Sequence, residues 1–359
     1  LECGIGGDAL DSLDSLLGRD EMAATCLKTL DADPRHYTHK HALRDLDEIR
    51  QLLGYERINL WGGSWGTRAA LLYAASYPKA VRSVVLDGAV PLDMEFPRSV
   101  ARDSERALDL LIAACSRDHD CTAAYPNARG ALSQLLERLE RKPLTVEAPH
   151  PQTGELTTVT LGRPALAEIV RVALYTPTDA SRLLRILLHA GQGNLKPLMA
   201  QVVKSASTST DSMALGATLS ILCSEDMPLV RNVDFDGEGR GTFVGSGYAD
   251  AWRSRCKVWP IGETLKLEPA LRLEAPALIL SGHHDPVTPA RWGEAMTRHF
   301  PNSLHIVVPG AAHNASFSGC VPDLIAEFIK RGRGEGIDAS CAQQVAWPPF
   351  VTSDAGATS

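Results

Sequence analysis

A glycine- and serine-containing pentapeptide constrains this 359-residue chain more than any other feature. Gly62-Gly63-Ser64-Trp65-Gly66 follows the apolar run Ile58-Asn59-Leu60-Trp61 and opens a predicted helix over Thr67–Ser76. So tight a turn between strand and helix strains the serine backbone and accepts only glycine-sized residues two positions to either side. Gly62 and Gly66 meet that demand. A glycine-rich loop around an ordinary serine is the alternative, but the flanking strand and helix favour Ser64 as an exposed nucleophile.

Two loops near the end of the chain offer the base and the orienting acid that a nucleophilic serine needs. The predicted strand Ala277–Leu280 leads into a loop that contains Asp285, and the predicted strand Leu304–Val308 leads into a loop that contains His313. Ligands bind outside the carboxyl ends of parallel strands, where residues from several loops meet. The chain order serine, aspartate, histidine is one in which such triads occur. We therefore predict a catalytic triad of Ser64, Asp285 and His313.

Each of these partners has a rival. His283 and His284 adjoin Asp285, but adjacent residues at a strand end point in different directions and further ligands are not evident, so we predict no metal site and no cofactor. Asp87 also ends a predicted strand and could serve as the acid. Because Gly88 follows it, a turn is the preferred interpretation. The other histidines lie in helices, in loops or within a strand: His36, His39, His41, His119, His150, His189, His299 and His305.

Composition excludes several classes of protein. With 44% apolar and 22% charged residues the chain is typical of a soluble globular protein. Its formal charge of -7 leaves no basic face for nucleic acid, and no run of Lys or Arg suggests binding to anionic lipid. The longest apolar runs are far too short to span a bilayer. We expect neither a nucleic-acid partner nor a membrane.

The beginning of the chain and its cysteines suggest a processed, extracytoplasmic protein. The first residue is Leu1 and not Met, and residues 1–36 show loop and short helix where an α/β domain usually has its opening strands, so we expect a piece of a longer product. No charged-then-apolar leader opens the chain. The even number of cysteines, none in C-x-x-C spacing, predicts disulfides and a secreted or periplasmic location. Roughly a hundred pairings remain open, although pairing of sequence neighbours would close short loops. Buried free thiols in a cytosolic protein are the alternative. The eight are Cys3, Cys26, Cys115, Cys121, Cys223, Cys256, Cys320 and Cys341.

The pattern of strands and helices predicts an α/β fold, a doubly wound parallel sheet with a mostly helical insertion. A helix over His36–Leu53 and a β-α-β unit from Ile58 to Leu86 are followed by helical periodicity, and strand-helix alternation resumes only at Ala277. We expect the insertion to lie over the strand ends as a cap. The predicted division is residues 1–91 for the first part of the core, 92–270 for the cap, 271–345 for the second part of the core and 346–359 for a loose tail.

Within the predicted cap, helices are expected from amphipathic spacing and one hairpin from apolar runs around Gly154. The Gly- and Asp-rich stretch Asp234–Ser246 is predicted to be a loop. The expected helices cover residues 100–116, 128–141, 165–174, 180–189, 195–203 and 213–223, and the hairpin covers residues 144–161.

Taken together, these motifs resemble the secreted bacterial tripeptidyl and prolyl aminopeptidases of the α/β-hydrolase superfamily, which have a TAP-like C-terminal region. The resemblance spans nearly the whole chain; it is specific at the nucleophile, the acid loop and the cysteines, and vague through most of the cap. The matching stretches are Tyr37-Thr38, Asp45-Leu46-Asp47, Leu53-Gly54-Tyr55, Gly62 to Thr67, Leu86-Asp87-Gly88, Cys223-Ser224-Glu225, Cys256 to Pro260, Ser281-Gly282, Asp285 to Pro289, and His313 followed by Cys320.

The resemblance implies an activity and a role for each site residue. Ser64 attacks the scissile carbonyl, His313 relays the proton and Asp285 orients His313, which gives an acyl-enzyme that water hydrolyses. Enzymes of this family remove residues or short peptides from free N-termini, and a buried carboxylate is a direct way to hold the ammonium group. Glu225 is the candidate and Asp226 its rival; a surface glutamate at a helix end is the alternative reading.

Two departures from the family pattern concern the site. Family members carry strands and a Gly-Gly-Pro-Gly-like loop upstream, whose backbone supplies half of the oxyanion hole. Gly4-Ile5-Gly6-Gly7 does not replace that loop, because no strand precedes it. Trp65 N–H then supplies the one expected donor, and loss of the other costs about 100- to 1000-fold in turnover. Ala312-His313-Asn314 stands where glycines commonly flank the histidine, with little expected effect. Without its neighbouring strands, Ile58–Trp61 becomes an exposed, aggregation-prone apolar edge.

Two other functions are compatible with the same residues. A carboxylesterase would use the same triad with a different pocket. A catalytically impaired fragment or a non-catalytic binding protein would keep the fold without the activity.

Overall fold

A computed structural model describes residues 1, 3, 20–149, 155–202, 214–266 and 271–353. The chain divides into two compact units. The sheet unit comprises residues 36–95 and 263–348, and the helical unit comprises residues 1–35, 96–262 and 349–359. Residues 1–35 thus group with the helices, although they were predicted to belong with the sheet. The boundaries predicted from the sequence stay predictions.

Four parallel strands form the sheet of the sheet unit, in the order β1-β2-β5-β6. This confirms the doubly wound parallel sheet, and each predicted strand is present and slightly longer than expected. Register places Gly63 opposite Asp87, and Asp87 opposite Leu280, so the carboxyl ends of the strands lie side by side. The strands are β1 (Ile58–Gly63), β2 (Val81–Asp87), β5 (Ala277–Gly282) and β6 (Ser303–Val308).

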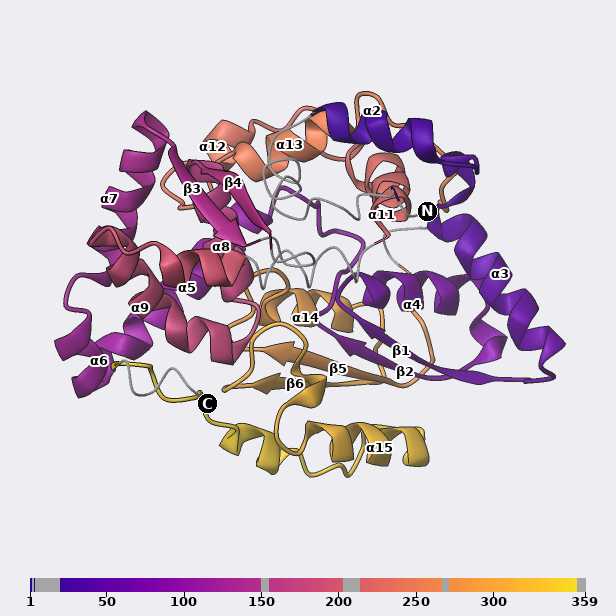
Figure 1. Cartoon of the computed structure of the whole chain (residues 1–359). Helices are drawn as coiled ribbons and strands as arrows, with labels where there is room; N and C mark the ends of the chain where they lie inside the picture. Colours follow the sequence, from indigo (N-terminus) through magenta and orange to yellow (C-terminus); the bar gives the residue numbers. More distant parts are fainter. Residues whose placement is uncertain (2, 4–19, 150–154, 203–213, 267–270, 354–359) are drawn as a thin grey trace. The chain divides into compact units, whose positions relative to one another are not determined.

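Helices cover both faces of this sheet (Figure 1). Side chains of neighbouring residues on a strand point to opposite faces, so Leu86 and Val85 on β2 belong to different cores. Phe300 shares the first core, and Phe328 the second. A strand covered on both faces reads as a nearly continuous apolar run, as β5 does over Ala277–Leu280 and β2 does over Val84–Leu86. Helices α3 (His39–Leu52), α4 (Trp65–Ser76) and α14 (Ala290–Thr297) pack on the first face, and α15 (Val321–Arg331) packs on the second.

The strand β1 is an edge strand within the described residues, as the sequence analysis expected. Its burial alternates, with Leu60 in the core and Trp61 55% exposed. The ring of Trp61 lies 6.2 Å from that of Phe317, which is itself exposed. Trp61 of this edge strand and Phe317 therefore expose two neighbouring aromatic side chains.

The helical unit contains the predicted hairpin and most of the predicted helices. Strands β3 (Leu144–Pro149) and β4 (Leu156–Leu161) pair antiparallel, while Gly154 between them lies outside the described residues. Residues 196–202 are helical; position 203 of that predicted helix and position 213 of the next one are outside the described residues. The helices are α2 (Asp20–Thr29), α5 (Val100–Arg117), α6 (His119–Ala124), α7 (Ala128–Arg141), α8 (Arg163–Ala173), α9 (Pro177–Gly191), α11 (Leu215–Ile221), α12 (Phe235–Gly239) and α13 (Gly247–Arg255).

Three short helices of the helical unit, α6, α12 and α13, were not predicted. Of these, α12 corrects the loop expected over Asp234–Ser246. The glycines there serve a close approach of two backbone segments: a Cβ on Gly239 would overlap the backbone of Gly245. Sequence rules read such glycines as irregular structure. The helix α6 is stabilised by its cap, since Cys121 N–H donates to the carboxylate of Asp118 at 2.8 Å.

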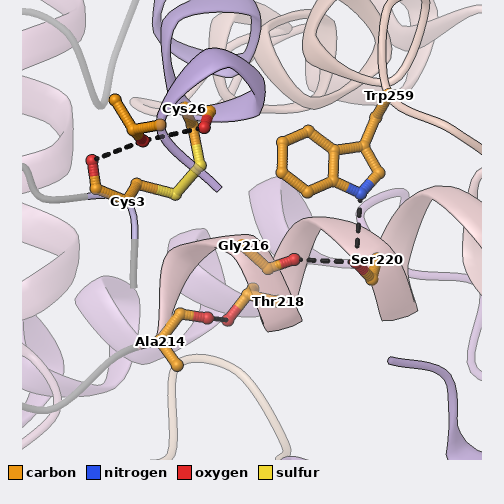
Figure 2. The surroundings of a disulfide bond; sticks show 8 residues. Cys3, Cys26, Ala214, Gly216, Thr218, Ser220 and Trp259 are labelled. Atoms are coloured by element: carbon orange, nitrogen blue, oxygen red, sulfur yellow. Dashed lines mark hydrogen bonds between the residues drawn. A yellow bond between two sulfur atoms is a disulfide. The ribbon is translucent and has the colours of Figure 1, made fainter. Parts of the chain in front are cut away.

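All eight cysteines are paired, and each disulfide joins neighbours in the sequence of cysteines. Figure 2 shows the surroundings of one of them, where Trp259 Nε1–H donates to Ser220 Oγ at 3.1 Å. Four disulfides fit an oxidising compartment. The pairs are Cys3–Cys26, Cys115–Cys121 and Cys223–Cys256 in the helical unit, and Cys320–Cys341 in the sheet unit.

No helix within the part of the chain that the structure describes has the length and apolar character needed to cross a membrane.

A buried carboxylate joins α3 to α4. Asp47, which is 5% exposed, accepts hydrogen bonds from Arg50 Nε at 2.8 Å, Tyr73 Oη at 2.8 Å and Gln51 Nε2 at 2.7 Å. The bond from Arg50 outweighs burial and, with those from Tyr73 and Gln51, lowers the pKa of Asp47. Burial, followed by the bond to Asp47, raises the pKa of Tyr73 to about 12.

Replacing Asp47 by asparagine is expected to lower the free energy of unfolding by about 1–3 kcal/mol, because buried donors lose a charged acceptor. Asp45→Asn is the matched control, since the side chain of Asp45 is 60% exposed and pairs with Arg44 at the surface. Urea denaturation at neutral pH measures both variants.

The same comparison at lower pH has a defined sign. The pKa of Asp47 is lower in the folded state, so its contribution is present above the unfolded value of about 4 and is lost as the pH falls through the folded value. The difference between wild type and Asp47→Asn should therefore shrink in acid. Equal stabilities at neutral pH would contradict this role.

Candidate active site

Ser64 occupies a strained turn between β1 and α4. Its backbone has φ 52° and ψ -121°, a conformation that costs energy for any residue with a side chain. Hydrogen bonds hold it there: Ser64 N–H donates to the carbonyl of Asp87 at 2.7 Å, and Thr67 Oγ1 donates to the carbonyl of Ser64 at 2.6 Å. Thr67 Oγ1 in turn accepts from Val90 N–H at 2.8 Å. The strain expected for a nucleophile at this position is present.

The two glycines that flank Ser64 at two positions to either side, Gly62 and Gly66, have different roles, which corrects the expectation that both must be small. A Cβ on Gly62 would overlap the carbonyl oxygen of Gly66 and lie 2.8 Å from the nitrogen of Thr67. A Cβ on Gly66 would meet nothing within 4 Å beyond the backbone of its own helix. Of these two positions, the steric demand therefore acts on Gly62 and not on Gly66.

Asp285 and His313 form a buried acid–base pair. The carboxylate of Asp285, 0% exposed, accepts from Nδ1–H of His313 at 2.9 Å. It also accepts from the backbone N–H groups of Val287 and Thr288, both at 2.8 Å, and from Thr288 Oγ1 at 2.7 Å. Burial alone would raise the pKa of Asp285, but His313 and these hydrogen bonds lower it below its usual value. Because Nδ1 carries the proton donated to Asp285, neutral His313 has its acceptor lone pair on Nε2.

The loop that carries His313 lies against the turn that carries Ser64. A Cβ on Gly63, the residue before Ser64, would be 3.2 Å from Oδ1 of Asn314. A Cβ on Gly88 would be 3.4 Å from Cε1 of His313. The loops after β1, β2 and β6 therefore meet, and the structure brings Asp285 and His313 beside the nucleophile turn.

Asn314 shows why glycine suits the position after the histidine. It has φ 63° and ψ 85°, in the left-handed region that glycine enters freely and that asparagine tolerates best among the other residues. Asn314 therefore adopts the backbone conformation that glycine would adopt at this position.

Asp87 is more than the turn former that the sequence suggested. Its carboxylate is buried and accepts from Ala315 N–H at 2.8 Å and from Ser316 N–H at 2.7 Å. Burial raises its pKa, against the opposing effect of Ser316, Ala315 and His313. Asp285, and not Asp87, is the acid that contacts His313. Thr288, whose hydroxyl donates to Asp285, was also missed. The sequence indicates a turn after Asp285 but not which side chain bonds to its carboxylate.

The rival histidines have other neighbours. His284 packs its ring against Trp347 with centroids 4.1 Å apart, and His283 meets His284 edge to face. His305 shares a 3.0 Å hydrogen bond with Ser281 on the adjacent strand. In the described ranges no group of three or more His, Cys, Asp or Glu side chains could hold a metal ion.

The remaining predicted site residues are placed as follows. Trp65 is the first residue of α4, so its backbone N–H lies in the positive first turn of that helix. Glu225 belongs to the helical unit, half-buried in a π-helical turn over Leu222–Asp226 that contains the disulfide-bonded Cys223. Asp226 in the same turn is fully buried. Gly4-Ile5-Gly6-Gly7 lies outside the described residues.

Two family models match the chain. The model described as alpha/beta hydrolase fold matches residues 18–156, and the model described as TAP-like protein matches residues 242–341. The first covers the turn around Ser64, and the second covers Asp285, His313 and the fourth disulfide.

Several curated relatives are peptidases by name. Serine protease Hip1 of Mycobacterium tuberculosis is 25% identical over 333 residues, covering 85% of this chain and 62% of its own length. The chain thus spans less than two thirds of that relative. The tripeptidyl aminopeptidase of Streptomyces lividans is 36% identical over 70 residues, 20% of this chain and 13% of its own. Among solved structures, a proline iminopeptidase of Mycobacterium smegmatis shares 16% identity over 84% of this chain and 74% of its own, with a TM-score of 0.36.

The asymmetry between the two glycines can be tested directly. Gly62→Ala is expected to cost about 1–3 kcal/mol or more in the free energy of unfolding, because the new methyl group overlaps backbone that cannot rotate away. Gly66→Ala is the matched control and is expected to be neutral or up to about 1 kcal/mol stabilising, since alanine favours helix over glycine. Urea denaturation compares the two variants with wild type, and equal losses for both would contradict the one-sided packing.

Proposed function

We propose that this chain, which belongs to the α/β-hydrolase superfamily and carries a TAP-like C-terminal region, is a serine peptidase with Ser64 as nucleophile. The observation that carries the proposal is the 2.9 Å hydrogen bond between His313 and the buried Asp285, on loops that adjoin the strained turn of Ser64. The names of the relatives support peptide bonds as the substrate.

The geometry supports a two-step acyl transfer. Nε2 of His313 takes the proton from Ser64 Oγ as the oxygen attacks the scissile carbonyl carbon, and His313 then gives that proton to the departing amine. Water, deprotonated by His313, hydrolyses the resulting ester. Asp285 stays ionised, holds the imidazole and stabilises its charged form. Its lowered pKa suits this role at neutral pH.

The negative oxygen of the tetrahedral intermediates needs hydrogen-bond donors. Trp65 N–H follows the nucleophile directly and points along the start of α4, where the helix dipole favours negative charge. We assign it as one oxyanion donor.

We further propose that the enzyme acts on free N-termini and that Glu225 binds the substrate ammonium group. A half-buried carboxylate makes a stronger charge-assisted hydrogen bond to an ammonium than a fully solvated one. The Cys223–Cys256 disulfide restrains the turn that carries it. Asp226 is the rival carboxylate. Four disulfides support a secreted or periplasmic location for the enzyme.

Active-site labelling tests the nucleophile. A fluorophosphonate probe should form one covalent adduct on wild type, located at Ser64 by peptide mass spectrometry, and none on Ser64→Ala. His313→Ala should slow labelling by several orders of magnitude, because the serine loses its base. Ser116→Ala, at an exposed position of α5, is the serine control and should label normally. An unchanged adduct on Ser64→Ala, or no labelling of wild type, would contradict the proposal.

Substrate choice tests the ammonium site. Aminoacyl and tripeptidyl p-nitroanilides with free amines should be cleaved better than their N-acetylated forms. Glu225→Gln should raise KM for the free-amine substrates by about 10- to 100-fold, the worth of a hydrogen bond to a charged group. Glu137→Gln is the matched control, as that side chain is 72% exposed on α7.

Three other outcomes of this assay are informative. Equal rates on free and blocked amines would contradict exopeptidase specificity, and a strong preference for p-nitrophenyl esters would favour a carboxylesterase. The same effect from Asp226→Asn in place of Glu225→Gln would transfer the role to Asp226.

A further inference from the structure

We infer that Asp87 is a positioning residue that holds the nucleophile turn and the histidine loop in a fixed relation to each other. This inference rests on the proposed roles of Ser64 and His313. Asp87 touches neither the substrate nor the reacting atoms in this account. It acts through backbone groups on both sides of the site.

Asp87 bonds to both segments at once. It ends β2, whose neighbours are β1 on one side and β5 on the other. Its backbone carbonyl accepts from Ser64 N–H at 2.7 Å, and its carboxylate oxygens accept separately from Ala315 N–H at 2.8 Å and Ser316 N–H at 2.7 Å. Asp87, which is 1% exposed, thus accepts three hydrogen bonds. Together they connect the nucleophile to the segment that begins two residues after His313.

The carboxylate suits its two donors in number and in charge. Ala315 and Ser316 start the short helical turn Ala315–Phe317, whose first N–H groups have no carbonyl partner within the turn. A carboxylate offers one oxygen to each of them, and a charged acceptor in a buried site binds more strongly than a neutral one. Asparagine has a single carbonyl oxygen, so one N–H would face its NH2 group instead.

The connection to His313 is short and stiff. Only Asn314 separates His313 from Ala315, and Asn314 is in a left-handed conformation with little freedom. A shift of the Ala315 backbone is therefore passed to the imidazole. A misplacement of about 1 Å in a catalytic group can cost about 100-fold in rate.

The negative charge of Asp87 also interacts with the imidazole of His313, in addition to the charge of Asp285. The electrostatic attraction between Asp87 and His313 is one of the effects that oppose burial in setting the pKa of Asp87. By reciprocity, the Asp87 carboxylate stabilises the imidazolium that forms during the reaction, beside the direct partner Asp285. Both aspartates therefore interact electrostatically with His313.

Asp87→Asn tests the inference, with Asp93→Asn as the matched control. Asp93 lies six positions further along the same connection, at the surface, where it pairs with Arg298. Turnover is measured per fluorophosphonate-titrated site, so that unfolded protein does not count. We expect Asp87→Asn to lower kcat by about 10- to 100-fold with KM within about twofold, since substrate contacts are untouched. We also expect the acid limb of kcat/KM to move to lower pH, while Asp93→Asn matches wild type.

A purely structural role would move neither readout. If Asp87→Asn melts at a lower temperature but keeps the wild-type kcat per site and the wild-type pH profile, the inference is wrong. If Asp87→Asn does not fold, Asp87→Glu keeps the charge with one more methylene: a lower kcat with an unmoved acid limb supports the inference, and a wild-type kcat overturns it. Failure of the proposed function is separate, because wild type would then show no adduct at Ser64.

Discussion

The hydrogen bonds of Asp87 are the interaction on which the rest of the site depends. In the parallel register Gly63, Asp87 and Leu280 lie opposite one another on neighbouring strands. The backbone pairing by itself therefore places the carboxyl ends of three strands side by side. Asp87 converts this alignment into a defined geometry, since its carbonyl holds Ser64 and its carboxylate holds the turn after His313. The strained conformation of Ser64 persists because these bonds and those of Thr67 compensate for it.

Two buried aspartates at one sheet edge have opposite pKa shifts, which separates their roles. Both are desolvated, which raises a carboxyl pKa. At Asp285 the attraction of His313 and the donated hydrogen bonds outweigh burial. At Asp87 burial outweighs the opposing effects of Ser316, Ala315 and, more indirectly, His313. The acid that faces the imidazole is thus the one kept ionised most firmly, as an orienting acid requires.

Much of this arrangement is predictable from the sequence, because it follows from strand ends. Apolar runs located β1, β2, β5 and β6, and the polar residues just after them predicted Ser64, Asp285 and His313. What was mistaken depends on tertiary contacts. The need for glycine at 62 but not at 66 arises from one backbone overlap, and α12 was hidden by glycines that permit a close approach. Asp87 was predicted to be a turn residue, because an aspartate before a glycine is typical of turns. Nothing near it in the sequence indicates that its carboxylate binds backbone N–H groups more than two hundred residues away.

The pairing of His313 with Asp285 is the central claim, and proton NMR of the imidazole tests it most directly. A hydrogen bond from Nδ1–H to a buried carboxylate shifts its proton far downfield and protects it from exchange with water. With selectively labelled histidine, we predict one such resonance in wild type and in Ser64→Ala, absent from His313→Gln and lost or moved far upfield in Asp285→Asn. A wild-type spectrum without that resonance, or one unchanged by Asp285→Asn, would contradict the account.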